Sequence, residues 1–568
     1  MSLKTFDVAI VGGGPAGTTC ASLLLKYNPR LEVVLVEREK FPRDHVGESQ
    51  LPVIGKVLDE MGCWGKVEAA GFPIKIGATY KWGRSDELWD FEFVPDGKFT
   101  GSKRPGQYVG QRRQTAFQVD RAIYDKILLD HAISLGCEVR QPKAVRKVET
   151  AGDRIESLVL EDGEEIRAKW YVDASGHAGV LRRAMGVEIE APTSLQNIAI
   201  WDYWQNADWA VSIGVGGTRV QVISIGYGWI WFIPLGPTRT SVGLIVPAAY
   251  YKECGKRPEE LYQEALAAAP IISRLMEKAT CENKLSTTKD WSFVSERLAG
   301  ENWFLAGESA GFADPILAAG MTLAHMGARD VAYAILAAER RDYEIGWLRE
   351  WYDRSNRQKI GQHIRFADFW YSANGCFADL KDHTKAIAKD AGLELTSDEA
   401  WRWLGTGGFV DADELGAGLG GFNVGAVRAL ADKFVDLPET SVLAGTNTYR
   451  LNLEGAEKGW GAQLEGGRIN RHRTYCRNGK SLPNAGTFRT VIAATKQTID
   501  FDALLDTLRV QAENNGMSQR QLDELVQQAF TALEGMVEDG WVEASCDPSI
   551  EPLVVPTDRA ALIHANRD

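Results

Sequence analysis

The chain has 568 residues, and its 64 lysines and arginines against 77 aspartates and glutamates give a formal net charge of −13. This length is too great for one hydrophobic core and predicts two or three domains. A hydrophobic fraction of 45% with 25% charged residues argues against long disorder. Because so acidic a chain is poorly suited to binding a phosphate backbone, nucleic acid is excluded as its main partner.

Targeting and metal-binding signals are absent from the sequence. No apolar run approaches about 18 residues, and the N-terminus lacks the basic and then apolar pattern of a signal peptide, so we expect no transmembrane segment and a cytoplasmic location. The eight cysteines are scattered without a Cys-x-x-Cys pair. We therefore expect neither a disulfide framework nor a metal site.

The chain opens with the order strand, glycine-rich turn, helix, strand and acid. An apolar run at 6–11 is followed directly by GGGPAG at 12–17, a helical pattern through Leu25, a second apolar run at 31–36 and then Glu37. This order is typical of a dinucleotide-binding unit of the Rossmann type. A glycine-rich turn in this full context is a much stronger indication than the same turn alone.

Each part of this unit has a physical role. The first glycine permits the tight turn, the second lets backbone amides approach a pyrophosphate, and the third allows the helix to pack closely on the strand. The helix N-terminus supplies partial positive charge, and the acid can accept ribose hydroxyls. A second glycine-rich segment, 416–421, follows the polar stretch 411–415, which cannot be a buried strand, so we expect one dinucleotide site. The residues predicted to bind it here are Gly12, Gly14, Ala16, Gly17 and Glu37.

Two later segments indicate that the dinucleotide is FAD. The apolar strand 170–176 ends in Asp-Ala-Ser-Gly, and the strand 303–307 is followed by an acid and then by a predicted helix at 320–339. An acid can accept ribityl hydroxyls, and helix-end amides can stabilise negative charge on a reduced flavin. The residues predicted to contact FAD in these segments are Asp173, Gly176, Glu308, Asp314, Gly320 and Met321.

With these motifs the chain resembles the FAD-dependent monooxygenases of the hydroxybenzoate hydroxylase type, although Glu308 replaces their usual aspartate. Three segments further resemble the flavin-dependent halogenases, especially those acting on phenols, pyrroles or carrier-bound acyl chains. They read FPRDHVGESQLP at 41–52, WIWFIP at 229–234 and FADPILAAG at 312–320. This resemblance implies further FAD contacts by Arg43 and Ser49. It also implies one by Arg121, in a predicted strand-to-helix segment at 117–130, although a structural role for Arg121 is an equal alternative.

The resemblance also implies an activity that uses FADH2, O2 and a halide, either chloride or bromide. A halogenase keeps its substrate away from the flavin, so that hypohalous acid forms first. Trp229 and Trp231, with Pro234, would block the substrate and leave a passage for this oxidant, although their alternation also fits a strand buried on both faces. Backbone N–H groups at Ala319 and Gly320 would form the small anion site that binds the halide. Ala318 replaces the serine of the family motif, so the backbone donors remain but a hydroxyl donor is lost.

A halogenase also needs a cationic group between flavin and substrate. Lys75, flanked by apolar residues on a predicted strand, aligns with the active-site lysine of the family. Lys81 is an alternative, because an even separation predicts the same strand face. Burial of either lysine would lower its pKa and favour a nucleophilic amine.

The predicted fold class is α/β. We expect a Rossmann-like FAD-binding fold with an inserted mixed β-sheet on the substrate side and a C-terminal, mainly helical module of winged-helix-like type. This last module is acidic, so we expect it to cap the active site or to dock a partner rather than to bind DNA. We expect its helices at 488–494, 501–510 and 519–534 and its strand at 536–542. The predicted domains are 1–190 with 285–375 for FAD binding, 191–284 for the inserted sheet, 376–480 for a Gly- and Trp-rich connection, and 481–568 for the C-terminal module.

These observations leave three functions open. The first is an FADH2-dependent halogenase acting on a small-molecule or carrier-protein-bound substrate and supplied by a separate NAD(P)H-dependent flavin reductase, since no NAD(P)H domain is visible. The second is a related monooxygenase or geranylgeranyl-reductase-like oxidoreductase acting on a lipophilic substrate. The third is a non-catalytic flavoprotein that serves as a binding module.

Overall fold

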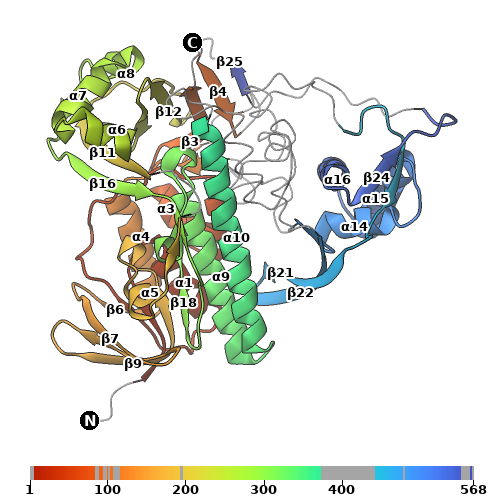
Figure 1. Cartoon of the computed structure of the whole chain (residues 1–568), viewed down its shortest axis with the longest axis horizontal. Helices are drawn as coiled ribbons and strands as arrows, with labels where there is room; N and C mark the ends of the chain where they lie inside the picture. Colours follow the sequence, from red (N-terminus) through yellow and green to blue (C-terminus); the bar gives the residue numbers. More distant parts are fainter. Residues whose placement is uncertain are drawn as a thin grey trace. The chain divides into compact units, whose positions relative to one another are not determined.

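The computed structural model of the chain describes residues 5–82, 88–93, 99, 103–106, 115–191, 196–372, 442–477, 480–551 and 563–565. Two compact units make up the chain, one consisting mainly of residues 1–377 and the other mainly of residues 378–465 and 469–563. The second glycine-rich segment at 416–421, with most of the predicted connecting region, lies outside the described residues. Figure 1 shows the course of the chain within each unit.

The first sheet of the first unit has the strand order β6-β2-β1-β9-β8-β7, with β18 pairing on β9. The strands β6, β2, β1, β9 and β18 run parallel to their neighbours, whereas β7 and β8 add an antiparallel edge. Strand β2 is buried throughout, as expected for a parallel sheet covered on its faces. The bounds are β1 Thr5–Val11, β2 Val33–Val36, β6 Glu138–Arg140, β7 Val145–Ala151, β8 Arg154–Leu160, β9 Glu165–Asp173 and β18 Trp303–Leu305.

Helices α1, α4, α9 and α10 pack beside this sheet, and Figure 1 shows α9 and α10 as two long neighbouring helices. α1 begins at Pro15, within the segment GGGPAG, and α9 begins at Gly320, the last residue of the segment FADPILAAG. Both helix N-termini therefore lie where the sequence motifs predict the dinucleotide. The bounds are α1 Pro15–Tyr27, α2 Val53–Met61, α3 Trp64–Ala69, α4 Arg121–Ser134, α5 Val180–Ala184, α9 Gly320–Arg340 and α10 Ile345–Ser372.

The second sheet of this unit is mixed and includes the strand order β15-β11-β14-β13-β12-β3-β4. Its strands β11 to β14 come from the predicted insertion, whereas β3 comes from the N-terminal part of the chain and pairs in parallel with β12. The bounds are β3 Ile74–Lys81, β4 Trp89–Glu92, β5 Ala116–Phe117, β11 Gln196–Gln205, β12 Gly217–Ile225, β13 Gly228–Pro234, β14 Arg239–Pro247, β15 Thr280–Cys281 and β16 Ser286–Trp291; β10 Ile189–Glu190, β17 Phe293–Ser295 and β19 Gly311–Phe312 form a smaller sheet.

One face of the mixed sheet carries an apolar core shared with a group of short helices. Ile223, Ile230 and Leu244 lie side by side in neighbouring strands and pack with Leu261 of α7. Because side chains alternate along a strand, the residues between them point to the opposite face. The bounds of these helices are α6 Ala248–Cys254, α7 Pro258–Ala267 and α8 Pro270–Leu275.

The second unit has its own core, formed by three helices and two paired strands. Phe488, Leu508, Leu533 and Trp541 are among its buried residues. Three further strands of the described chain lie between 457 and 483, within and just beyond the predicted Gly- and Trp-rich connection. The bounds are β20 Thr448–Leu451, β21 Glu457–Glu465, β22 Arg468–Arg477, β23 Lys480–Pro483, α14 Gly486–Ala494, α15 Phe501–Asn514, α16 Gln519–Glu538 and β24 Val542–Ser545. The strand β25, Ile563–Ala565, instead belongs to the mixed sheet, where it pairs with β4.

The predicted α/β FAD-binding fold is confirmed, and so are the strands before and after the glycine-rich turn. The predicted strand at 536–542 is wrong, because α16 continues to Glu538 and the strand β24 begins at Val542. Met536 is buried and lies in α16, which ends at Glu538, two residues before Gly540, whose φ of +72° favours glycine. The winged-helix character of the second unit stays a prediction.

Candidate active site

The glycine-rich turn between β1 and α1 is built for close backbone approach. Gly12 has φ +109°, and a Cβ at this position would lie 2.1 Å from the carbonyl oxygen of Ala174. A Cβ at Gly17 would lie 1.9 Å from the carbonyl oxygen of Gly12. α1 then begins without a side-chain cap at Gly14, so its first N–H groups are available to an anion.

The acid and the arginine predicted to bind the dinucleotide both lie beside this turn. Glu37 Oε2 accepts the backbone N–H of Gly13 at 2.7 Å, which holds the carboxylate against the turn. Arg43 Nη2 lies 3.7 Å from the position that a Cβ on Gly14 would occupy. A guanidinium group beside a helix N-terminus suits a diphosphate, because it adds charge-assisted hydrogen bonds to the exposed helix amides.

Arg121 organises the loop that carries the motif VGES. Its guanidinium group binds both carboxylate oxygens of Asp125, at 2.7 and 2.9 Å. Its Nη1 atom also donates to the backbone carbonyls of Val46 and Gly47, both at 3.0 Å. Arg121 therefore fixes the loop on α4, and its predicted contact with FAD stays a prediction.

Several buried polar side-chain atoms along this loop and its neighbours have no hydrogen-bond partner. Ser49 and Gln118 form a β-bridge, so their side chains come from adjacent backbone segments. Unpartnered buried polar groups are uncommon in folded proteins, and a polar ligand is one explanation when several of them lie close together. The residues present thus fit the polar groups of FAD. The atoms are Ser49 Oγ, Gln50 Nε2, Gln118 Nε2 and Oε1, Asn197 Oδ1 and Thr322 Oγ1.

The two acids after β9 and β18 have different environments. Asp173 accepts hydrogen bonds from Ser175, from Leu181 N and from Arg182 N, so its carboxylate holds the local turn. Glu308 lies at the start of the next turn, and its Oε2 atom is 3.7 Å from the Cβ position of Gly176. Burial raises the pKa of Glu308, while the charge of Arg121 opposes this rise. Of the two, Glu308 is the acid better placed to accept ribityl hydroxyls.

The segment before α9 presents backbone N–H groups where the halide was predicted to bind. Ala318 has φ +55° and ψ +32°, and Ala319 has φ −80° and ψ −18°. Successive residues of opposite hand turn their N–H groups toward one side, which forms a small anion-binding concavity. The Ala318 N–H already donates to Pro315. The groups of this concavity left for an anion are those of Ala319 and Gly320, with Met321 following in the first helical turn.

The two tryptophans of WIWFIP are buried in β13 and hydrogen-bonded. Trp229 Nε1 donates to the hydroxyl of Tyr371 at 2.9 Å, and that hydroxyl donates to Asp314 Oδ1 at 3.0 Å. Trp231 Nε1 donates to Ser241 Oγ at 3.1 Å. The ring of Trp231 lies over Gly243, where a Cβ would be 2.1 Å from its Cζ2 atom. The pair is therefore rigidly held, which suits a wall.

Lys75 lies in β3 and is only 3% exposed. Burial lowers the pKa of its amine from 10.5 to about 7. Its Nζ atom lies 5.3 Å from the ring centroid of Phe93, and it forms no ion pair with any residue that the structure describes. About half of the Lys75 amines would therefore be neutral near pH 7, which permits both hydrogen bonding and nucleophilic attack.

The strand register separates Lys75 from Lys81. Lys75 pairs with Thr218, but Gly77 pairs with the next residue of β12, Arg219, so the register shifts at this point. The shift breaks the alternation on which the prediction of a shared face depended. Lys81 pairs with Ile223, on the face of the apolar helices. The expectation that the two lysines share a face is wrong, and the alternative role for Lys81 loses its basis.

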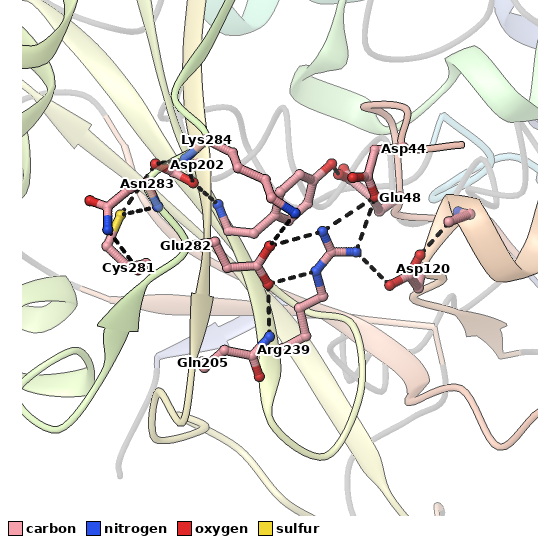
Figure 2. A network of polar contacts seen from close by, with 12 residues as sticks. Asp44, Glu48, Asp120, Asp202, Gln205, Arg239, Cys281, Glu282, Asn283 and Lys284 are labelled. Atoms are coloured by element: carbon pink, nitrogen blue, oxygen red, sulfur yellow. Dashed lines mark hydrogen bonds and ion pairs between the residues drawn. The ribbon is translucent and has the colours of Figure 1, made fainter. Parts of the chain in front are cut away.

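A charged network that the sequence did not indicate joins the mixed sheet to the VGES loop, as Figure 2 shows. Arg239 of β14 donates to Asp120 Oδ2 at 2.6 Å and to Glu282 Oε1 at 3.1 Å, and it pairs with Asp44 at 3.3 Å. Arg239 also lies over the ring of Tyr203, 4.0 Å from its centroid. The network thus connects β14 and β15 to the start of α4 and to the cofactor loop.

Tyr203 extends this network to a buried acid of the loop. Its hydroxyl donates to Glu48 Oε1 at 3.0 Å, and the N–H of Gly47 donates to Glu48 Oε2 at 3.0 Å. Burial raises the pKa of Glu48 to about 6. Glu48 belongs to the quoted motif, so sequence reasoning could have selected it. Tyr203 and Arg239 carried no such signal, because their partners are distant in the chain.

The comparisons with known proteins agree with this arrangement. The model of the FAD binding domain family matches residues 5–366. The chain is 32% identical to the 1H-pyrrole-2-carbonyl-[peptidyl-carrier protein] chlorinase of Pseudomonas fluorescens, over 66% of this chain and 86% of that protein. The chain belongs to the flavin-dependent halogenase family. It is also 34% identical to a tryptophan 2-halogenase of Chondromyces crocatus, over 63% of this chain and 66% of that protein.

Solved structures of the family share the fold. The crystal structure of the flavin-dependent halogenase CmlS matches with a TM-score of 0.70 and 24% identity, over 97% of this chain and 98% of that one. The structure of the myxobacterial chondrochloren halogenase CndH matches with a TM-score of 0.59 and 26% identity, over 77% and 98%. Within the described part of the chain, no helix is long and apolar enough to cross a membrane, and no cluster of side chains could hold a metal ion.

Proposed function

We propose that this halogenase-family chain uses FADH2, O2 and chloride or bromide to halogenate an electron-rich aromatic or acyl substrate through Lys75. The observation that carries the proposal is a buried amine without an ion pair among the described residues, on the same sheet as the tryptophan pair. Reduced FAD, when bound, would activate O2, and O2 would be the oxidant that converts halide to hypohalous acid. The residues of the chain would hold the cofactor, bind the halide and direct the oxidant.

The roles of the chain's residues follow from their places. The glycine-rich turn with Arg43 would hold the diphosphate, and Glu37 and Glu308 would accept the ribose and ribityl hydroxyls. The backbone amides of Ala319 and Gly320 would bind the halide. The Lys75 amine would hydrogen-bond the hypohalous acid, or take its halogen as a haloamine, before transfer to carbon.

The names of the relatives support an aromatic substrate, either free or carried by a protein. One relative is named for chlorination of a pyrrole-carbonyl carrier protein, one for tryptophan and one as a sulochrin halogenase. We further propose that a separate NAD(P)H-dependent flavin reductase supplies FADH2, because no second dinucleotide motif of the required context is present in the sequence.

The decisive experiment starts from anaerobically reduced enzyme and adds oxygen with chloride or bromide and the chlorination probe monochlorodimedone. We expect halide-dependent halogenation and no consumption of NAD(P)H without added reductase. Rapid NAD(P)H consumption without halide would instead support the related oxidoreductase. A bound flavin that does not react with oxygen would support the non-catalytic binding module.

A further inference from the structure

Thr218 of β12 is the direct neighbour of Lys75 across the strand pair. The two residues are partners in the parallel register of β12 and β3, so their side chains lie side by side on one face of the sheet. Thr218 has an exposed fraction of 0%, and its Oγ1 atom has no hydrogen-bond partner in the described part of the chain. A buried hydroxyl without a partner thus adjoins a buried amine without an ion pair among the residues described.

The register also places this pair on the face that bears the tryptophans. Thr218 and Val222 lie on the same face of β12 because they are four residues apart, and Val222 pairs with Trp231 of β13. The spacing from Thr218 to Val222 is about 13 Å along the strand. Lys75 pairs with Thr218 before the register shift, so Lys75 lies on the same face as Thr218. Arg219, the next residue of β12, points to the other face and forms an ion pair with Asp90.

An unpartnered hydroxyl does not by itself mark a site. The same sheet contains a second unpartnered threonine hydroxyl with which Thr218 can be compared. Thr240 of β14 is equally buried, and its Oγ1 atom also lacks a partner. However, its neighbour Ser241 binds Trp231, so Thr240 points to the opposite face, toward the apolar helices. What distinguishes Thr218 is its place beside Lys75 on the tryptophan face.

We propose that Thr218 is a further catalytic residue, whose hydroxyl and the Lys75 amine together bind the oxygen of one small hydroxyl group. The proposal rests on the proposed function, which supplies two such groups: hypohalous acid and the hydroxyl of a phenolic substrate. A third polar group between the two side chains would give the Thr218 hydroxyl the partner that it lacks among the described residues, and it would also accept a hydrogen bond from the Lys75 amine.

The chemistry of the transfer gives this site a role. The halogen–oxygen bond of hypohalous acid breaks as the carbon–halogen bond forms, and the substrate carbon loses its proton. The oxygen takes up that proton and leaves as water. Two donors aimed at this oxygen stabilise the negative charge that develops on it while the halogen departs. Without them, the acid is held less firmly and escapes into solution.

The test compares Thr218→Val, which removes the hydroxyl with little change in volume, with Thr218→Ser, which keeps it. Thr240→Val is the matched control, because it makes the same change at equal burial on the opposite face. In the halogenase assay we expect Thr218→Val to lower halogenated product per FADH2 oxidised by about tenfold and to raise the hypohalous acid trapped outside the enzyme. Thr218→Ser and Thr240→Val should remain within about threefold of the wild type.

A comparison of a phenol with a pyrrole as substrate shows whether the bound hydroxyl group comes from hypohalous acid or from the substrate. If the site holds hypohalous acid, Thr218→Val impairs a phenol and a pyrrole alike. If it holds the substrate hydroxyl, only the KM for the phenol rises. Thr218→Ala provides a second variant should Thr218→Val fail to fold.

A readout without flavin completes the test. The Lys75 amine is titrated by NMR in the flavin-free protein, where loss of the neighbouring hydroxyl should lower its pKa further, because an oxygen dipole beside an ammonium stabilises the charge. Equal product yields and equal pKa values in Thr218→Val and Thr240→Val would overturn the proposal for Thr218 alone. A wild-type enzyme that makes no halogenated product would overturn the proposed function as well.

Discussion

The two ends of the tryptophan face differ in how their polar groups are satisfied. At one end, Trp229 bonds to Tyr371 and Tyr371 to Asp314, so each polar atom of that chain has a protein partner. At the other end, Lys75 and Thr218 are equally buried, yet the structure shows no hydrogen bond for the Thr218 hydroxyl and no described ion pair for the amine. A satisfied buried network makes a rigid wall, whereas unsatisfied groups are held ready for a ligand.

We expect the largest effect on halogenation from a substitution at the end of the tryptophan face that contains Lys75. Lys75→Ala should lower halogenation by at least about a thousandfold while FADH2 oxidation by oxygen continues at the wild-type rate, because only the step after oxidant formation needs the amine. Lys81→Ala, on the opposite face, is the control and should leave product formation unchanged. Unaltered halogenation in Lys75→Ala would show that the two ends do not differ in function.

The pH dependence of the product yield tests the role of the Lys75 amine. The pKa of Lys75 is lowered from 10.5 to about 7, so the neutral amine is scarce below pH 6 and predominates above pH 8. If the neutral amine takes the halogen, product per FADH2 oxidised should rise with pH through about 7 and then level off. The measurement is product yield from pH 5.5 to 8.5, with free hypohalous acid counted separately. A yield that falls across this range would require the ammonium form instead.

The Arg239 network should give the next largest effect. Arg239→Ala leaves Asp44, Asp120 and Glu282 without their shared cation, so we expect a loss of about 2–4 kcal/mol in the free energy of unfolding. The VGES loop should loosen and the Kd for FAD should rise about tenfold. Urea unfolding and flavin fluorescence measure the two quantities. Lys278→Ala, which removes an exposed pair with Asp208, should change the unfolding free energy by less than about 1 kcal/mol.

The contribution of the hydrogen bonds around Trp229 to stability can be tested by removing one oxygen atom. Tyr371→Phe deletes the acceptor of Trp229 and a donor to Asp314 with almost no change in volume, so we expect a loss of about 1–3 kcal/mol in unfolding free energy. Thermal or urea unfolding measures this loss. An unchanged midpoint would mean that the wall is held by packing alone.

The smallest effect concerns Glu48. The pKa of Glu48 in the folded protein is about 6, above the ordinary value of 4.5, so folding favours the protonated acid. The contribution of Glu48 to the free energy of unfolding is therefore present below about pH 4.5 and is lost as the pH rises through 6. The loss is about 2 kcal/mol, from a difference of about 1.5 pKa units. Glu48→Gln does not titrate, so the difference in unfolding free energy between variant and wild type should grow by about that amount from pH 4.5 to 7.

The sequence alone was sufficient for features that depend on residues close together in the chain. The strand, the turn at Gly12 to Gly17 and the following helix are local, and only glycine fits the contact with Ala174. The same holds for the acid after β2, the FADPILAAG segment and the burial of the tryptophan strand. Lys75 was selected by resemblance to a family, and its burial agrees with that choice.

Tertiary structure decided what depends on pairing between distant segments. Strand register, or packing between segments more than forty residues apart, sets the neighbour of Lys75, the face of Lys81, the partner of Trp229 and the carboxylates around Arg239. Periodicity fixes which residues of one strand share a face, but a single register shift reverses that assignment for the remainder of the strand. The physical reason is that side-chain partners in a sheet are chosen by the neighbouring strand, whose identity and offset no local pattern contains.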